Sequence, residues 1–211
     1  MKERIRLAFN EMAREYDALL KDFYPGKRQW GFNESNQIRM FLGAYEKLYG
    51  NSVTWQELSA GVKNQRIDGF VWDRDINGIL YIEAKRLNSQ TKLEEMVNDY
   101  NRLCNKAFRE SLLCMSPGGC PMASGIVDCS EHILLLCDIW DECSEAPLRE
   151  WIADWGKTTF DGQSTGGNPI LERIGPIPSG NVTVMRSEPI MPMTSASSSA
   201  YYLAGLSVVI K

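Results

Sequence analysis

The sequence predicts a single α/β domain in which helices flank a mixed central sheet, and three observations support this fold class. The chain has 211 residues, enough for one compact domain of ordinary size. Hydrophobic residues make up 44% of the chain and charged residues 24%, which is the composition of a globular protein with an apolar core. Segments with helical periodicity also alternate with short strand-like segments. We therefore assign residues 1–211 to one domain.

Two amphipathic helices and a three-stranded unit are expected in the first half of the chain. The helices place apolar side chains at every third or fourth position, and Pro-Gly or Gly follows each of them. The strands are short apolar runs, and turn residues join the last two into an antiparallel hairpin. The expected helices span 3–22 and 34–49, and the expected strands span 54–58, 66–72 and 79–85.

The second half of the chain is predicted with less regular structure. A long helix is expected over 91–113, then a loop, and then a buried strand over 131–140. A short helix is expected at 147–155. Residues 161–199 are rich in Gly, Ser, Pro and Thr, so we expect a long loop or insertion with one strand near 182–185. A strand over 202–210 closes the domain.

Charge and residue counts exclude several classes of protein. The net charge of −4 argues against bulk electrostatic binding of nucleic acid. However, residues 1–109 carry a net charge of +3 and residues 110–211 a net charge of −7, so a polyanion would meet the first half. The only histidine is His132, which makes nucleases of the HNH type and most His-ligated zinc sites poor fits.

The compartment is expected to be the cytoplasm. The N-terminal residues contain no apolar signal region, and no stretch approaches the roughly 18 apolar residues of a membrane span, so no membrane association is expected. Six cysteines lie within forty residues, but their spacing is irregular and contains no C-x-x-C pair. We therefore expect reduced thiols rather than a zinc site or disulfides. The cysteines are Cys104, Cys114, Cys120, Cys129, Cys137 and Cys143.

Three charged residues interrupt the two strands of the predicted hairpin. Asp68 lies in the first strand, and Glu83 and Lys85 share one face of the second. Because burying an isolated charge costs several kcal/mol, these side chains should be paired, bound to a metal ion or set at the mouth of a cleft. For a single strand pair, ordinary ion pairs of Asp68 with Arg66 and of Glu83 with Lys85 are the default interpretation.

The length of the hairpin loop decides whether the two carboxylates meet. A four-residue loop, 74–77, places Asp68 directly opposite Glu83, with their Cβ atoms about 4.5–5.5 Å apart. At that separation two carboxylates can hold one divalent cation. A two-residue Asn-Gly turn would instead place Asp68 opposite Leu87, and the carboxylates would be too far apart.

These residues resemble the D…(D/E)-x-K signature of the PD-(D/E)xK nucleases, the restriction-endonuclease-like superfamily. Asp68 is followed after fourteen residues by Glu83-Ala84-Lys85. The order of elements matches as well: a helix bearing Glu34, a three-stranded meander with the motif on its second and third strands, and a following helix. The match covers about a third of the chain. Ile67 stands where the family commonly has proline.

The resemblance implies a restriction-endonuclease-like fold and a role for each matching residue. Asp68 and Glu83 would bind Mg²⁺ or Mn²⁺ with the backbone carbonyl of Ala84, and Glu34 would be an outer ligand. Lys85 would orient the attacking water and favour its deprotonation. The implied activity is metal-dependent hydrolysis of phosphodiester bonds, with DNA the expected substrate and endonuclease favoured over exonuclease. Relatives often act in host defence or in phage and mobile-element DNA processing, and often as homodimers.

Basic residues around the motif are candidate phosphate contacts: Lys63, Arg66, Arg86, Arg102, Lys106 and Arg109. The last three fall at i, i+4 and i+7, which places them on one face of the predicted 91–113 helix. They are as well explained by a solvated helix face. From the same helix, Asn98 and Tyr100 are expected to face the site.

A different class of function remains open at this point. A catalytically inactive module with the same fold would bind nucleic acid or a protein partner without hydrolysis, and the acidic second half favours this alternative. A protein-binding inhibitor or immunity factor with an acidic face is a second alternative.

Overall fold

The computed structural model describes residues 1–22, 33–59, 65–113, 128–140, 169–174, 177–190 and 201–211. Five helices, a short 3-10 turn and six strands lie within these ranges. In chain order they are α1 (Lys2–Asp22), α2 (Glu34–Leu48), β1 (Ser52–Ser59), β2 (Arg66–Asp73), β3 (Gly78–Arg86), α3 (Gln90–Cys104), α4 (Lys106–Leu113), β4 (Ser130–Trp140), α6 (Pro169–Ile174), η2 (Ser179–Asn181), β5 (Val182–Arg186) and β6 (Tyr201–Val209).

The strands form one mixed six-stranded sheet in the order β1-β2-β3-β4-β6-β5. Strands β3 and β4 are parallel, and the other neighbours are antiparallel. The parallel pair lies at the centre and is connected through α3 and α4, because parallel strands need a crossover connection. The two strands from the end of the chain complete the sheet beyond β4.

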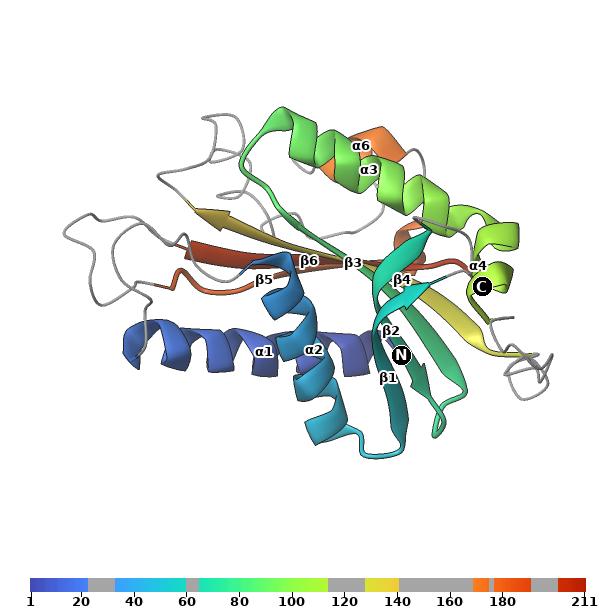
Figure 1. Cartoon of the computed structure of the whole chain (residues 1–211), viewed down its shortest axis with the longest axis horizontal. Coiled ribbons are helices and arrows are strands. Elements are labelled where there is room, and N and C mark those ends of the chain that lie inside the picture. The colour runs from blue at the N-terminus through green and yellow to red at the C-terminus, as the bar shows by residue number, and fades with distance from the viewer. Residues whose placement is uncertain (23–32, 60–64, 114–127, 141–168, 175–176, 191–200) are drawn as a thin grey trace.

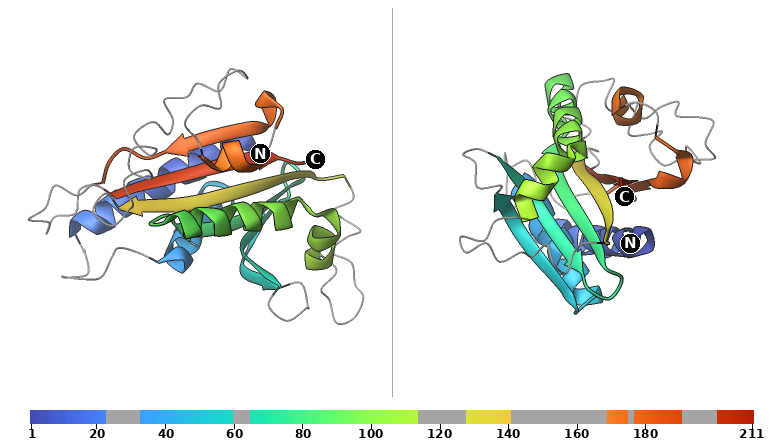
Figure 2. Two further views of the ribbon diagram at one scale, coloured as in Figure 1. Left: turned by 90° about the horizontal axis from the view of Figure 1, so that it is seen from above. Right: turned by 90° about the vertical axis from the view of Figure 1, so that its right-hand side faces the viewer.

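Helices cover both faces of this sheet (Figures 1 and 2). The α1 and α2 helices pack on one face, where Phe9, Phe41 and Leu134 belong to a single apolar cluster. The α3, α4 and α6 helices pack on the other face, where Phe70 and Leu112 belong to a second cluster. The sheet is therefore buried on both sides, and a charged side chain on β3 or β4 has little access to water.

Most predicted elements are confirmed to within two residues. Both N-terminal helices, the three-stranded unit and the buried strand β4 are present. Loop 74–77 of the β2–β3 hairpin has four residues, as the arrangement of the two carboxylates required. None of the helices in the described part of the chain is long and apolar enough to cross a membrane.

The predicted single helix over 91–113 is wrong, because it divides at Asn105. The backbone of Asn105 is extended, at φ −71° and ψ 113°, and its side-chain oxygen accepts a hydrogen bond from the backbone N–H of Phe108 at 3.2 Å. Asn105 therefore ends α3 and caps α4, as asparagine commonly does at a helix start. The apolar periodicity on both sides of this residue concealed the break.

Residues 161–199 contain more structure than a loop with one strand. The described part of this stretch includes the α6 helix and a 3-10 turn as well as β5, whose predicted position is confirmed. The closing strand β6 is internal to the sheet, between β4 and β5. The predicted helix at 147–155 lies outside the described residues, as do Cys114, Cys120 and Cys143, whereas Cys104, Cys129 and Cys137 are free thiols.

Candidate active site

The two strands of the β2–β3 hairpin stop pairing at the motif. Their regular partners end at Gly69 and Ile82, one position before Asp68 and Glu83 would face each other. At this point the Asp68 carboxylate accepts a hydrogen bond from the backbone N–H of Ala84 at 2.9 Å. The Asp68 side chain thus accepts a hydrogen bond from the backbone of β3 at a position where the two strands no longer pair. This hydrogen bond holds the Asp68 carboxylate beside β3.

Glu83 carries the most strongly perturbed carboxyl of this region. Its side chain is only 2% exposed, and its Oε1 lies 2.6 Å from Nη2 of Arg102 on α3. Burial, together with the negative charges of Asp68 and Asp99, outweighs the guanidinium and raises the pKa of Glu83 to about 9. The carboxylates of Asp68 and Glu83 are therefore close enough to repel each other, as the predicted pairing required.

Lys85 lies beside these carboxylates and forms an ion pair with Asp99, with Nζ and Oδ2 3.1 Å apart. Burial lowers the pKa of Lys85, but the charges of Asp99, Asp68 and Glu34 more than offset burial and leave the pKa above its usual value. Lys85 is therefore a fixed positive charge at neutral pH. It cannot act as a general base there.

Asp99 is a site residue that the sequence analysis missed. It lies on α3 and interacts with both Lys85 and Arg102. The residues expected to face the site were its neighbours, yet Asn98 is exposed and Tyr100 is packed in the apolar cluster under α3. The helical phase of the buried positions on α3 was the available signal, because Asp99 follows the buried Met96 by three residues.

Glu34 reaches the site from the first turn of α2. Its Oε1 accepts a hydrogen bond from the backbone N–H of Arg86 at 3.2 Å, at the end of β3. Gly69 gives α2 room for this close packing, because a Cβ atom there would lie 3.1 Å from the Ile38 side chain of α2. Glu34 is close enough to Lys85 to act on its pKa.

Six residues thus form what we call the acidic cluster, with four carboxylates and two cations. This imbalance matters because Glu83 is buried, and Lys85 and Asp99 are only 14% and 18% exposed, so solvent screens their charges poorly. The cluster has a deficit of positive charge. Its members are Glu34, Asp68, Glu83, Asp99, Lys85 and Arg102.

The predicted phosphate contacts do not form one basic track. Arg66 is exposed and pairs with Glu57, and Lys106 is 81% exposed. Arg86 and Arg102 are engaged by buried carboxylates. Lys63 lies outside the described residues.

Arg109 corrects the prediction that Arg102, Lys106 and Arg109 share one helical face. Its side chain is 8% exposed, donates to the carbonyl oxygens of Leu103 and Cys104 at 2.7 and 2.8 Å, and pairs with Glu131 at 2.7 Å. The break at Asn105 turns Arg109 back onto the end of α3. It is therefore buried rather than open to a phosphate.

The donor set of the cluster is chemically suited to Mg²⁺. Among the described residues no three His, Cys, Asp or Glu side chains are grouped as a ready metal cage. However, Mg²⁺ usually binds through one or two carboxylates and keeps several water ligands. Asp68 and Glu83, from neighbouring strands, can provide these two carboxylates. The Arg102 guanidinium lies 2.6 Å from Glu83, at the position where a cation would bind.

A second buried carboxylate, Asp138, lies on the other face of the sheet. Gln37 donates to its Oδ1 at 2.6 Å and Arg86 to its Oδ2 at 3.1 Å, and the Tyr201 hydroxyl acts on the same carboxylate. We call these four residues the Asp138 cluster. Burial raises the pKa of Asp138. Interactions with Arg86, Tyr201 and Gln37 lower the pKa and limit it to about 6. The partners of this carboxylate are donors, which is typical of a structural role.

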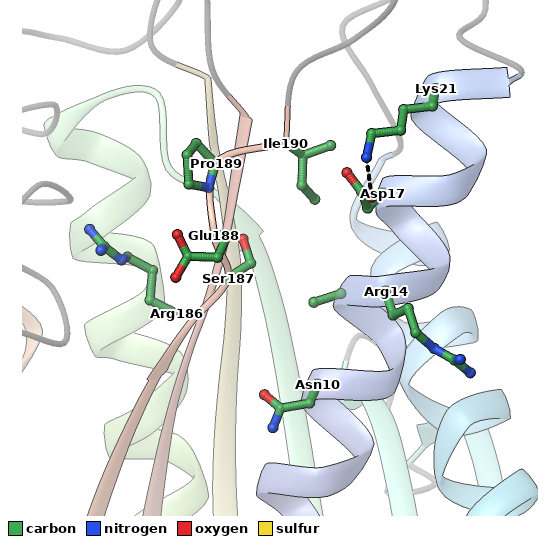
Figure 3. Close-up of a pocket in the computed structure, with 10 residues that line it drawn as sticks. Asn10, Arg14, Asp17, Lys21, Arg186, Ser187, Glu188, Pro189 and Ile190 are labelled. Atoms are coloured by element: carbon green, nitrogen blue, oxygen red, sulfur yellow. Dashed lines mark hydrogen bonds and ion pairs between the residues drawn. The ribbon is translucent and has the colours of Figure 1, made fainter.

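A cavity of about 540 Å³ lined by described residues offers less chemistry (Figure 3). It lies between α1 and the segment that follows β5. Lys21 and Arg14 border it, but they pair with Asp17 and Glu11 on their own helix. These paired surface charges give no reason to place a reaction here.

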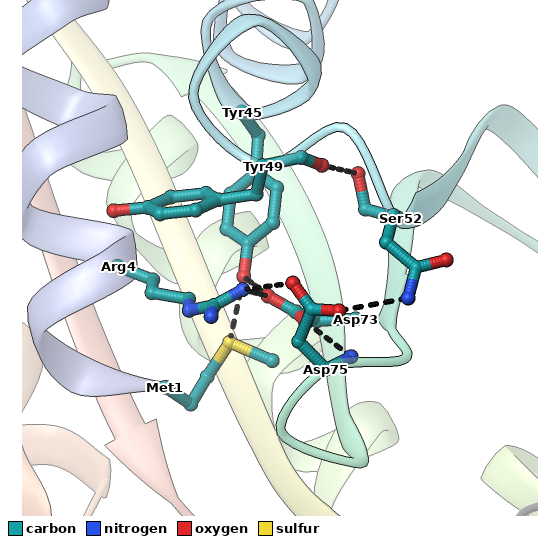
Figure 4. Close-up of polar contacts among 8 residues, drawn as sticks. Met1, Arg4, Tyr45, Tyr49, Ser52, Asp73 and Asp75 are labelled. Carbon is teal, nitrogen blue, oxygen red and sulfur yellow. Dashed lines mark hydrogen bonds and ion pairs between the residues drawn. The ribbon is translucent and has the colours of Figure 1, made fainter.

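The polar contacts around Asp73 are structural (Figure 4). The buried Asp73 carboxylate accepts hydrogen bonds from Arg4 and from the Tyr45 hydroxyl, both at 2.7 Å, and from the backbone N–H of Asp75 at 3.1 Å. Arg4 also stacks over Tyr49 at 4.5 Å. These contacts tie the start of α1 and the end of α2 to the hairpin that carries the site.

Comparison of the chain with protein-family models, with curated proteins and with solved structures gives no match.

Proposed function

We propose that the protein is a divalent-cation-dependent phosphodiesterase of the restriction-endonuclease-like type that cleaves DNA internally. The observation that carries this proposal is the acidic cluster, in which carboxylates from adjacent strands lie together, poorly screened and short of positive charge, beside a charged lysine. A structural ion pair needs only one carboxylate for each cation. The excess of carboxylates is what a divalent cation would neutralise.

Five of the six residues of the cluster have a task in this proposal. Asp68 and Glu83 hold Mg²⁺ or Mn²⁺, with Glu34 as an outer ligand and the Ala84 carbonyl completing the set. The cation supplies electrostatic stabilisation of the phosphoryl oxygens and lowers the pKa of the attacking water. Lys85 orients that water and favours its deprotonation through its positive charge, and Asp99 fixes the position of the ammonium group.

Cleavage assays with matched variants test this proposal. We expect purified protein with Mg²⁺ or Mn²⁺ to open supercoiled plasmid, and Glu83→Ala and Lys85→Ala each to lower the rate by about 100-fold or more. Lys92→Gln, on the exposed surface of α3, is the control and should cleave like the wild type. Single-stranded DNA and RNA serve as competing substrates. Cleavage that persists in both site variants would reject the assignment.

One observation favours the alternative of a catalytically inactive module. The Arg102 guanidinium already lies 2.6 Å from the Glu83 carboxyl group, as it would in a purely structural ion pair. In that case the protein would bind nucleic acid or a protein partner without cleavage in any metal. Salt-dependent DNA binding without cleavage would support this alternative over the hydrolase.

A further inference from the structure

The ion pair between Arg102 and Glu83 lacks the geometry of a permanent one. The same atom, Nη2 of Arg102, serves Glu83 at 2.6 Å and Asp99 at 3.0 Å, whereas the strong form of this pair uses two parallel hydrogen bonds. The Nε–H of Arg102 is buried and has no hydrogen-bond partner among the described residues. Arg102 therefore leaves a donor unused while it holds a buried carboxylate.

Arg109 on α4 shows what a fixed arginine looks like in the same chain. Its Nε pairs with Glu131 and its Nη1 donates to two backbone carbonyls, and the side chain is 8% exposed. Arg102 has four times that exposure, at 32%. Of these two arginines, Arg102 has the weaker geometry and the readier access to solvent.

We propose that Arg102 and a divalent cation bind Glu83 in a mutually exclusive manner, so that Arg102 closes the site until the cation displaces it. This inference rests on the proposed function and adds regulation of the same site. Asp99 is the acceptor that Arg102 keeps when it leaves Glu83. Since Asp99 precedes Arg102 by three residues on α3, the exchange needs only a side-chain rotation.

The exchange also changes what the site presents to a substrate. In the closed form the guanidinium charge is directed at Glu83, beneath the surface. In the open form the cation takes that place and Arg102 turns to the solvent, beside the position a phosphate would occupy. Arg102 then competes with the cation in the closed site and is a phosphate contact in the loaded site.

Calorimetric titration with Mn²⁺ alone, without nucleic acid, tests the exchange. We expect Arg102→Gln to bind Mn²⁺ about tenfold tighter than the wild type, because the competing charge is gone. Lys92→Gln removes one charge from the same helix but leaves the Arg102–Glu83 pair intact. Its Mn²⁺ affinity should stay within about twofold of the wild-type affinity. An Arg102→Gln affinity equal to or weaker than that of the wild type overturns the proposal, as does an absence of Mn²⁺ binding in both.

Two further measurements assign the effect to Glu83 and avoid dependence on one variant. Adding Arg102→Gln to Glu83→Gln should give no tightening, since the shared ligand is absent; a retained gain overturns the exchange. In the wild type, the ¹⁵Nε resonance of Arg102 should shift as Mg²⁺ saturates the site. An unchanged resonance at saturation also overturns the proposal.

The two proposals can fail separately. Tighter Mn²⁺ binding by Arg102→Gln in a protein that cleaves nothing would reject the hydrolase and keep the exchange. Cleavage by the wild type with unchanged Mn²⁺ affinity in Arg102→Gln would keep the hydrolase and reject the exchange.

Discussion

Glu83 and Asp138 are buried carboxylates on opposite faces of the sheet, and the surroundings of the two are opposite. Asp138, facing α1 and α2, accepts hydrogen bonds from Gln37 and Arg86. Glu83, facing α3, has one cation and two further carboxylates as neighbours. Both side chains are almost inaccessible to solvent, so burial does not distinguish them. The balance of charge does, and on this contrast we base the structural role of Asp138 and the chemical role that we propose for Glu83.

The largest expected difference between the clusters concerns removal of each carboxylate. Asp138→Leu leaves the Arg86 charge and the buried Gln37 amide without their acceptor, and should lower the free energy of unfolding by about 3–5 kcal/mol. Glu83→Leu removes a buried carboxyl group whose raised pKa leaves it largely protonated at neutral pH, and Arg102 keeps Asp99, so the free energy of unfolding should stay within about 1 kcal/mol of the wild type or rise. Urea unfolding measures both. Equal destabilisation would contradict the contrast.

The pH dependence of stability should separate the two carboxyl groups. Each pKa is raised in the folded state, so each group binds its proton more tightly in the folded than in the unfolded chain, and stability falls as pH rises between the two values. For Asp138 the fall runs from about pH 4 to 6 and amounts to at most about 3 kcal/mol. For Glu83 the fall in stability continues to about pH 9.

Amide variants isolate these contributions in urea unfolding experiments. Asp138→Asn should reduce the loss of stability between pH 4 and 6 to the part that Glu83 contributes. Glu83→Gln should remove the loss between pH 6 and 9. If Glu83→Gln kept the wild-type profile above pH 6, Glu83 would not be the group that holds the proton.

The smallest expected effect is stabilisation by metal. At a free Mn²⁺ concentration ten times the dissociation constant, the free energy of unfolding should rise by about 1.4 kcal/mol. The wild type and Asp138→Asn should both respond, and Glu83→Gln and Asp68→Asn should not. If Asp138→Asn abolished the stabilisation by Mn²⁺, the cation would lie on the face of the sheet that α1 and α2 cover, which would contradict the proposed site.

Much of the fold follows from local patterns in the sequence. Helical periodicity located α1 and α2, and the turn residues after Asp73 predicted the hairpin but left its loop length open between two and four residues, which the pairing of β2 with β3 decides. The division of the third helix was missed, because capping by Asn105 competes with an apolar pattern that continues across it. The internal position of β6 depends on pairing between distant segments, which no local pattern records.

The candidate site was only partly predictable, for a similar reason. Asp68, Glu83 and Lys85 interrupt apolar strands, so strand alternation singles them out. Asp99 and Arg102 occur in a helix with many charged residues, and only the packing of α3 on β3 selects them. Sequence patterns identify a charged residue that interrupts an apolar segment. They do not identify the functional residue among several charged residues on a polar helix.

The internal position of β6 also orders the assembly of the two clusters. Five members of the acidic cluster come from residues 68–102, so one hairpin and one helix bring them together through short loops. Asp138 meets Tyr201 only when β6 has paired with β4, across a long intervening segment whose closure costs more chain entropy. We therefore expect folding to build the candidate site from local contacts first, and the Asp138 cluster to close when the last strands join the sheet.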